Sequence, residues 1–221
     1  MTIPAFDAAQ TRDWTHRFAE SVYATEDELT ALDQQAGDGD FGTNLAAGVR
    51  AAGPLLERAG AGSGPAEVMG AMATAFLDEI GGTSGPLFGL LFQALSRAAA
   101  RSGPDLTTAV LAEGAAEGLA AIRRVGDASP GDKTLVDALS PAVDALRAAA
   151  DAPPAAALAT AAAGAWRGVR DTAVLTARMG RASYLGERAT GIPDPGAVGI
   201  ALFFASAGEE VRALAPHLTS G

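Results

Sequence analysis

The chain of 221 residues contains no cysteine and few aromatic or basic residues. The absence of cysteine excludes disulfides, thiolate zinc sites and cysteine nucleophiles. Lysine and arginine total 16 against 26 acidic residues, so the formal net charge is -10 at pH 7. Surfaces that bind nucleic acid through its phosphates need clustered basic side chains, so this charge argues against nucleic acid as a partner. An anionic ligand would need a local positive potential, from a metal ion or from helix N-termini.

Long hydrophobic runs are also missing. The longest uncharged apolar stretch, residues 195–208, is shorter than the about 20 residues that span a membrane, so we expect a buried helix there. Residues 1–13 lack the positive start and apolar block of a secretory signal, so a cytoplasmic location is expected. The 48% hydrophobic content is ample for a core, and no separating linker is visible, so we predict a single domain over residues 1–221.

Alanine and leucine dominate, and apolar positions recur at helical spacing. We therefore predict an all-α fold of eight helices, whose short connections favour an antiparallel up-and-down barrel or bundle. The expected helices are residues 7–24, 41–59, 65–80, 86–101, 106–125, 133–150, 154–177 and 195–215.

Polar and glycine-rich residues gather in four connections: residues 33–44, 81–85, 131–134 and 180–196. These precede the second, fourth, sixth and eighth expected helices. Alternate connections of an antiparallel bundle lie at the same end. The sequence therefore predicts one site at one end of the bundle.

The first of these connections carries three carboxylates, Asp33, Asp38 and Asp40, with glycines around the last two. Carboxylate oxygens at this density suit Mg²⁺, which commonly shares its coordination shell with nucleotide phosphates. The alternative is a solvated turn that caps the next helix. A calcium-binding EF-hand loop is disfavoured, because the glutamate at its twelfth position is missing.

The second connection, Gly-Gly-Thr-Ser-Gly before Pro86, is expected to present backbone N–H groups to an anion, with the hydroxyls of Thr83 and Ser84 as further donors. A simple helix cap at Ser84 is the alternative. The loop is not a Walker A loop, because the Gly-Lys-Ser/Thr ending is absent.

The third and fourth connections add charged candidates. Asp132 is a helix cap or a ligand contact, and Lys133 is a modest hint of function. Arg181 is the better candidate for a phosphate contact, because a guanidinium pairs with oxyanions through two hydrogen bonds. Arg188 is expected at a surface ion pair, and Asp194 is expected to cap the last helix.

Taken together, these segments resemble the L subunit (DhaL) family of dihydroxyacetone kinases along nearly the whole chain. The resemblance rests on Leu-Asp followed by Gly-Asp-Gly-Asp-x-Gly-x-Asn at 32–44, Gly-Gly-Thr-Ser-Gly-Pro-Leu-Phe-Gly at 81–89, Gly-Asp-Lys-Thr-Leu-Val-Asp at 131–137, and Gly-Arg-Ala-Ser-Tyr-Leu-Gly-Glu-Arg with a later Asp-Pro-Gly at 180–196. It implies an eight-helix barrel with ADP or ATP at one end.

The resemblance also implies roles for individual residues. Asp33, Asp38 and Asp40 would hold two Mg²⁺ ions that bridge the nucleotide phosphates. The residues around the phosphates would be Asn44, Thr83, Ser84 and Arg181, with Arg181 assisting catalysis. The residues enclosing the adenosine would be Gly131, Thr134, Leu135, Asp194 and Gly196.

In this family a separate subunit or domain (DhaK) holds the sugar, so the resemblance implies that phosphoryl transfer needs that partner. Where many relatives have histidine after Gly-Asp-Gly-Asp, this chain has Phe41. This departure leaves open whether ATP or a phosphohistidine protein of the phosphotransferase system supplies the phosphoryl group. It also leaves open whether the ketose is dihydroxyacetone or another such as erythrulose, and a homodimer is compatible with the sequence.

Two other interpretations compete with a kinase subunit. One is a non-catalytic nucleotide-binding regulator on the same fold, motivated by Phe41 and by the missing sugar domain. The other is the related fatty-acid kinase type, which the chain length and the Arg-Ala-Ser-Tyr-Leu-Gly segment disfavour.

Overall fold

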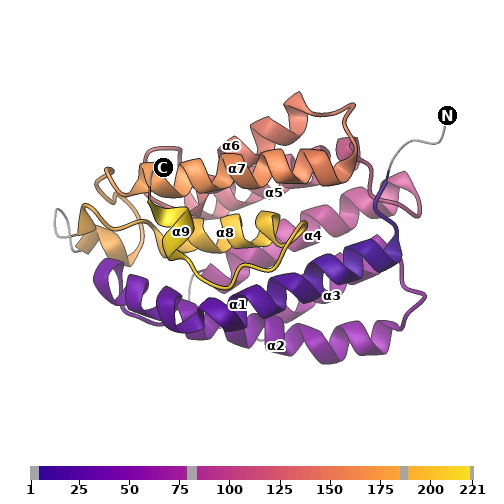
Figure 1. The fold of residues 1–221 in the computed structure, drawn as a ribbon, viewed down its shortest axis with the longest axis horizontal. Helices are drawn as coiled ribbons and strands as arrows, with labels where there is room; N and C mark the ends of the chain where they lie inside the picture. Colours follow the sequence, from indigo (N-terminus) through magenta and orange to yellow (C-terminus); the bar gives the residue numbers. More distant parts are fainter. Residues whose placement is uncertain (1–4, 79–83, 185–188, 220–221) are drawn as a thin grey trace.

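The computed structural model describes residues 5–78, 84–184 and 189–219, and this part of the chain contains helices but no strand beyond an isolated bridge between Phe6 and Leu106 (Figure 1). The helices are α1 (Ala8–Ala36), α2 (Phe41–Ala59), α3 (Pro65–Asp78), α4 (Ser84–Ser102), α5 (Thr108–Gly126), α6 (Leu135–Ala148), α7 (Pro154–Thr172), the 3-10 helix η1 (Arg181–Tyr184), α8 (Pro195–Ala205) and the short α9 (Ala215–Leu218).

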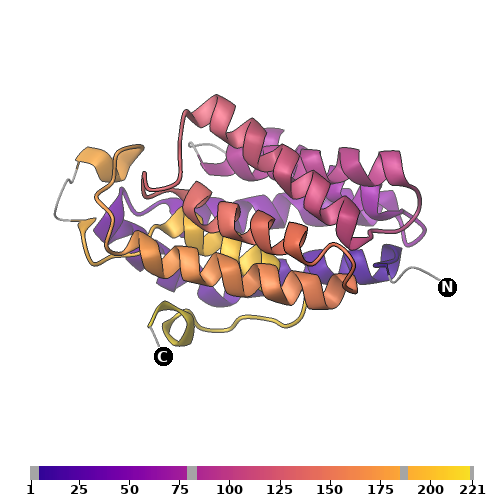
Figure 2. The same ribbon diagram turned by 90° about the horizontal axis from the view of Figure 1, so that it is seen from above.

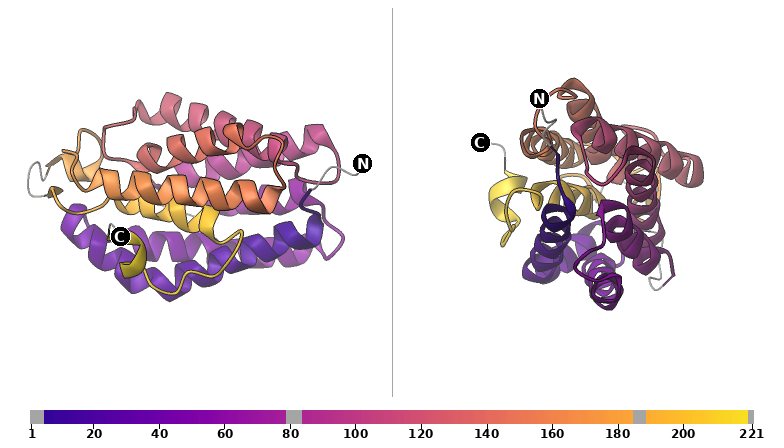
Figure 3. Two further views of the ribbon diagram at one scale, coloured as in Figure 1. Left: turned by 45° about the horizontal axis from the view of Figure 1, so that its top comes forward. Right: turned by 90° about the vertical axis from the view of Figure 1, so that its right-hand side faces the viewer.

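Helices α1 to α8 form a closed antiparallel barrel. Each helix packs against the next one in the chain, and α8 packs against α1, which closes the ring. The end-on view in Figure 3 shows this ring. The predicted all-α barrel is therefore confirmed. Within the described residues, every helix is too short or too polar to span a membrane.

Helix α8 differs from the others because its residues from Pro195 to Phe204 are all buried. Phe203 lies at the centre of an aromatic cluster, stacked on Trp14 and edge-on to Phe18 and Phe92. The Trp14 indole N–H also donates a hydrogen bond of 2.7 Å to the Phe203 carbonyl. Aromatic burial of this kind fixes α8 inside the barrel.

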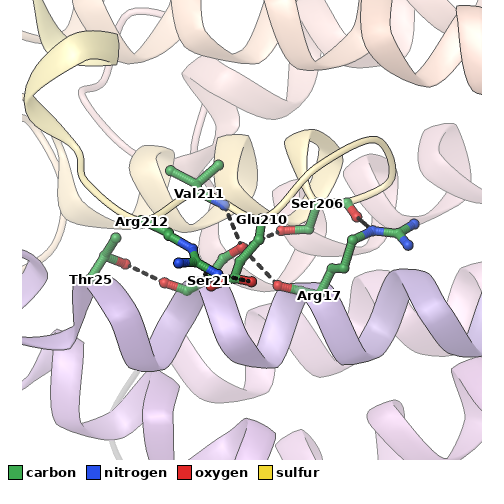
Figure 4. A network of polar contacts seen from close by, with 7 residues as sticks. All are labelled: Arg17, Ser21, Thr25, Ser206, Glu210, Val211 and Arg212. Atoms are coloured by element: carbon green, nitrogen blue, oxygen red, sulfur yellow. Dashed lines mark hydrogen bonds and ion pairs between the residues drawn. The ribbon is translucent and has the colours of Figure 1, made fainter.

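The segment after α8 covers its outer face, crossing between α1 and α7 in Figure 1. Figure 4 shows its contacts with α1. Arg17 donates to the carbonyls of Ser206 and Ala207, each at 2.8 Å, and the Ser21 hydroxyl accepts from the Val211 N–H at 2.9 Å. Further along, the His217 ring stacks on Trp166 with centroids 4.5 Å apart.

Three predicted boundaries were wrong. The first helix does not end at residue 24 but continues to Ala36, because Thr25, Leu29 and Leu32 keep a buried face through the polar run 25–28. The seventh helix ends at Thr172 rather than at residue 177. The eighth ends at Ala205 rather than at residue 215, because the chain turns after it and packs on α1. The other described ends lie within two residues of the prediction.

Side-chain caps fix two of the helix starts near the site. The Thr134 hydroxyl accepts from the Val136 N–H, and Asp137 accepts in return from the Thr134 N–H, so Thr134 caps α6. The expectation of a cap at Asp132 is therefore not met. Asp194 caps α8 as predicted, accepting from the Ala197 N–H at 2.7 Å.

Candidate nucleotide site

Helices α2, α4, α6 and α8 all begin at the same end of the barrel, where α1 ends (Figures 1 and 2). The N–H groups of a first helical turn have no partner within the helix and carry positive potential. Residues from all four helix starts line one cavity of about 210 Å³. The predicted meeting of the four connections is confirmed for the residues that the structure describes.

The three predicted metal ligands come together at the rim of this cavity. Asp33 lies in the last turn of α1, Asp40 lies just before α2, and Asp38 lies between them. Each offers one carboxylate oxygen, and these atoms lie within 4.8 Å of one another. Asp40 makes no side-chain cap bond with α2, and the N–H of Phe41 at the start of that helix is instead bound by the Asp33 carboxylate. Oxygen donors at this spacing fit a hard divalent cation such as Mg²⁺.

Two glycines let the backbone form this cluster. A Cβ on Gly37 would lie 2.4 Å from the Asp33 Oδ1 atom, so the carboxylate occupies the space that any side chain would need. Gly39 has φ +80°, a left-handed conformation that side chains other than glycine rarely adopt. The Gly-Asp-Gly-Asp pattern therefore turns the chain sharply and brings Asp38 and Asp40 back to Asp33.

The environment of Asp33 makes its ionised form less favourable than in water. Burial, followed by the negative charges of Asp38 and Asp40, raises the pKa of this carboxyl above its ordinary value. The Phe41 N–H, which donates to Asp33 Oδ2 at 3.0 Å, acts in the opposite direction. A bound cation would reverse the repulsion among the three carboxylates.

A second acidic group, Asp194, lines the cavity at the start of α8. Burial raises the pKa of Asp194 to about 7, helped by the charge of Asp137 and opposed by the Ala197 N–H and by Lys133. Lys133 is only 1% exposed, and burial lowers the pKa of its ammonium group. In the sequence Lys133 was only a hint of function, because its side chain is positioned by Thr172 and Ile192, which are distant in the chain.

The remaining wall is apolar and was not predicted from the sequence, apart from Leu135. It is formed by Phe41, Leu87, Ile122, Ala128, Val136, Met179 and Pro195. An apolar wall with polar groups at one edge is the usual lining of a small-molecule site. These positions carry no polar marker, so helical periodicity alone assigns them to the core.

The predicted site residues in the cavity wall are Asp33, Asp38, Asp40, Asn44, Ser84, Thr134, Leu135, Asp194 and Gly196. Gly131 lies outside the wall, and its N–H donates to Asp137 Oδ1 at 2.5 Å. Thr83, Arg188 and the side chain of Arg181 lie outside the described residues, although the Arg181 backbone belongs to η1.

A family model described as the DAK2 domain matches residues 35–209, which is more than half of the chain. The chain belongs to the DAK2-domain family. It is 34% identical to the protein named "PTS-dependent dihydroxyacetone kinase, ADP-binding subunit DhaL" of Lactococcus lactis, and the match covers 88% of this chain and 93% of that protein. The resemblance seen in the sequence is therefore confirmed.

Other DAK2-domain relatives are much longer. The chain is 39% identical to the D-erythrulose kinase of Mycolicibacterium smegmatis over 83% of its own length, but the match covers only 32% of that enzyme. The chain thus spans about a third of the erythrulose kinases that it matches.

The solved structures agree with this DAK2-domain fold. The dihydroxyacetone kinase of C. freundii in complex with AMP-PNP and Mg²⁺ superposes with a TM-score of 0.66 at 27% identity. The match covers 93% of this chain and 34% of that enzyme. That kinase was thus solved with a nucleotide analogue and Mg²⁺ bound.

Proposed function

We propose that this DAK2 domain is the ADP- or ATP-binding subunit of a dihydroxyacetone-type kinase. The observation that carries the proposal is the cluster of Asp33, Asp38 and Asp40, whose oxygens lie within 4.8 Å of one another at the mouth of a cavity surrounded by four helix starts. Magnesium and helix N-termini are two common partners of nucleotide phosphates, and here both would act at one place.

The residues present fit the proposed ligands. Two Mg²⁺ ions held by the three aspartates would neutralise the negative charge that develops on a transferred phosphoryl group. Asn44, Ser84 and Thr83 would lie around the phosphates, with Arg181 assisting the transfer. The apolar wall, with Thr134, Leu135, Asp194 and Gly196, would receive the adenosine part, and Gly131 would support the loop beside it.

The phosphoryl acceptor is proposed to be a short ketose held by a separate sugar-binding subunit of the DhaK type. The two histidines, His16 and His217, lie outside the cavity wall, and His217 is engaged with Trp166. Neither suits the holding of a sugar at this site. Dihydroxyacetone is the first choice, and the erythrulose kinases among the relatives make erythrulose the second.

The phosphoryl source, the assembly and the location form part of the same proposal. The relative in Lactococcus lactis is named PTS-dependent, so a phosphohistidine protein of the phosphotransferase system is one candidate donor, and free ATP is the other. A homodimer and a cytoplasmic location are also proposed. Gel filtration and cell fractionation would test the last two.

Reconstitution tests the function directly. The chain would be mixed with a DhaK-type subunit, Mg²⁺ and either ATP or the phosphohistidine protein, and phosphorylation of dihydroxyacetone and of erythrulose would be measured. We expect transfer only when both subunits are present. A chain that binds Mg-nucleotide but transfers to neither ketose with several such partners would instead be a non-catalytic nucleotide-binding regulator.

A further inference from the structure

Lys133 ties together two segments that are far apart in the sequence. Its Nζ donates to the carbonyl of Thr172, at the end of α7, at 2.5 Å, and to the carbonyl of Ile192, just before α8, at 2.6 Å. Thr172 then accepts, through its hydroxyl, the N–H of Asp194 at 2.8 Å. The ammonium group therefore links the start of α6, the end of α7 and the cap of α8.

The backbone at this position is unfavourable for a lysine. Lys133 has φ +61°, in the left-handed region, which is unfavourable for a residue with a Cβ and costs glycine little. The residue as a whole is also buried, at 1% exposure. Such a combination persists only where the surroundings enforce it, and it is concentrated at functional sites.

The tie lies beside the cavity rather than elsewhere in the core. Lys133 lines the cavity itself and, among the wall residues that the structure describes, it is the only basic one. The starts of α6 and α8, which Lys133 joins, are in close contact. A Cβ on Gly196 in α8 would lie only 3.3 Å from the Cβ of Leu135 in α6. A small shift of α8 would therefore change the shape of the cavity at Leu135, Asp194 and Gly196.

We propose that Lys133 is a positioning residue for the bound nucleotide: it holds the cap of α8 against the start of α6, and so keeps the adenosine side of the cavity in shape. The inference rests on the proposed function. It assigns Lys133 no contact with the phosphates, so its loss should affect nucleotide affinity but not the binding of a metal ion at Asp33, Asp38 and Asp40.

Arg17 provides a matched control. It also donates to two backbone carbonyls, those of Ser206 and Ala207, but it does so at the far end of α8 and outside the cavity wall (Figure 4). Lys133→Met and Arg17→Met thus remove the same kind of tie from the two ends of one helix. Each variant leaves two carbonyls without their cationic donor, so both should unfold at a lower temperature.

Calorimetry well below the unfolding temperature would give the Kd of Mg-ADP and the Kd of Mn²⁺ alone for each variant. For Lys133→Met we expect Mg-ADP to bind at least about tenfold more weakly, a loss of about 1.4 kcal/mol of binding free energy, because the starts of α6 and α8 would no longer be held together at the cavity. Its Mn²⁺ affinity should stay within about twofold of the original chain, and Arg17→Met should change neither constant by more than that, since only the first tie borders the cavity.

Two results would overturn the inference, and a third would overturn the proposed function as well. Unchanged Mg-ADP affinity in Lys133→Met refutes it, and equal weakening in Arg17→Met reduces it to general destabilisation. Failure of the unsubstituted chain to bind Mg-ADP refutes the proposed function as well.

A second pair of variants applies if Lys133→Met does not fold. Thr172→Val removes the hydroxyl that accepts the Asp194 N–H, whereas Thr172→Ser keeps it. We expect weaker Mg-ADP binding for the valine variant and binding within about twofold of the original for the serine variant. Equal affinity in the two variants would overturn the inference.

Discussion

At the residue scale, the aspartate cluster depends on a glycine as much as on its carboxylates. Gly37→Ala would place a Cβ 2.4 Å from Asp33 Oδ1, so the carboxylate must leave its present position beside Asp38 and Asp40. We expect Mg-nucleotide affinity to fall by about tenfold or more, because metal ligands tolerate only small displacements. Titration calorimetry measures this change.

Gly62→Ala is the control for that substitution, because nothing lies within 4 Å of a Cβ at Gly62. It lies in the connection between α2 and α3, at the other end of the barrel (Figure 1). Its nucleotide affinity should be unchanged. If Gly37→Ala also bound nucleotide normally, Asp33 would not be needed in its present position.

Asp194 gives the protein a testable pH dependence. Its pKa is raised to about 7 in the folded protein from an ordinary value of 3.8, so between these pH values the folded protein holds a proton that the unfolded chain has lost. The free energy of unfolding should therefore fall as pH rises from about 4 to about 7. At about 1.4 kcal/mol per pKa unit, the fall from this group is at most about 4 kcal/mol.

Urea unfolding of the metal-free protein at pH 5 and pH 8 measures this effect. Asp194→Asn removes the titrating group and keeps a side-chain oxygen that can accept from Ala197, so its stability should change less between the two pH values. An equal change in both proteins would show that Asp194 does not titrate in this range.

Phe41, which stands where many relatives have histidine, directs its ring into the core. Its ring is 5% exposed, lies 6.4 Å from the Phe88 ring between centroids, and would contact a Cβ at Gly199. The residue that replaces the common histidine is thus part of the core, while its backbone N–H still binds Asp33. The sequence showed the departure but not this position, because ring packing is set by α4 and α8.

At the scale of helices, the sequence patterns correctly predicted helices α1 to α8 and their order along the chain. They predicted the last residues of some helices poorly. The start of α8 followed from Asp194 and Pro195, since a cap and a proline at the first position are local signals. The end of α1 did not follow, because the polar run 25–28 resembles a break. Burial of Leu29 and Leu32 against the barrel overrides that local signal.

Helices α6 and α7 pack closely just after the connection of residues 131–134. A Cβ on Gly168 would lie 2.2 Å from the carbonyl oxygen of Asp137, which is backbone and cannot move away by itself. Gly168→Ala should therefore push the two helices apart and lower the free energy of unfolding by about 1–3 kcal/mol or more. Chemical denaturation measures the change.

Gly53→Ala, within α2, is the matched helical control, since nothing lies within 4 Å of a Cβ at Gly53. Alanine is a better helix former than glycine by about 0.5–1 kcal/mol, so this variant should be unchanged or slightly more stable. Equal destabilisation of the two variants would contradict the close approach of α6 to α7.

At the scale of the whole molecule, the site is a property of the barrel. The candidate residues come from the ends and starts of helices spread from Asp33 to Gly196, and the alternation of antiparallel helices brings them to one end. The net charge of -10 would by itself repel a nucleotide. Four helix starts, and a cation if one binds at the aspartates as proposed, would supply the local positive potential that the chain as a whole lacks.

Metal-dependent nucleotide binding at the aspartates is the central claim, and thermal unfolding tests it most directly. The chain, Asp38→Asn and the surface control Asp13→Asn would each be unfolded with ADP in Mg²⁺ and again in EDTA. Ligand at 100 times its Kd stabilises a protein by about 2.7 kcal/mol, which at roughly 2–4 °C per kcal/mol is a rise in Tm of about 5–10 °C. We predict this rise in Mg²⁺ only, for the chain and for Asp13→Asn, and its loss in Asp38→Asn; the same rise in EDTA, or in Asp38→Asn, would contradict a metal-bridged nucleotide at this cluster.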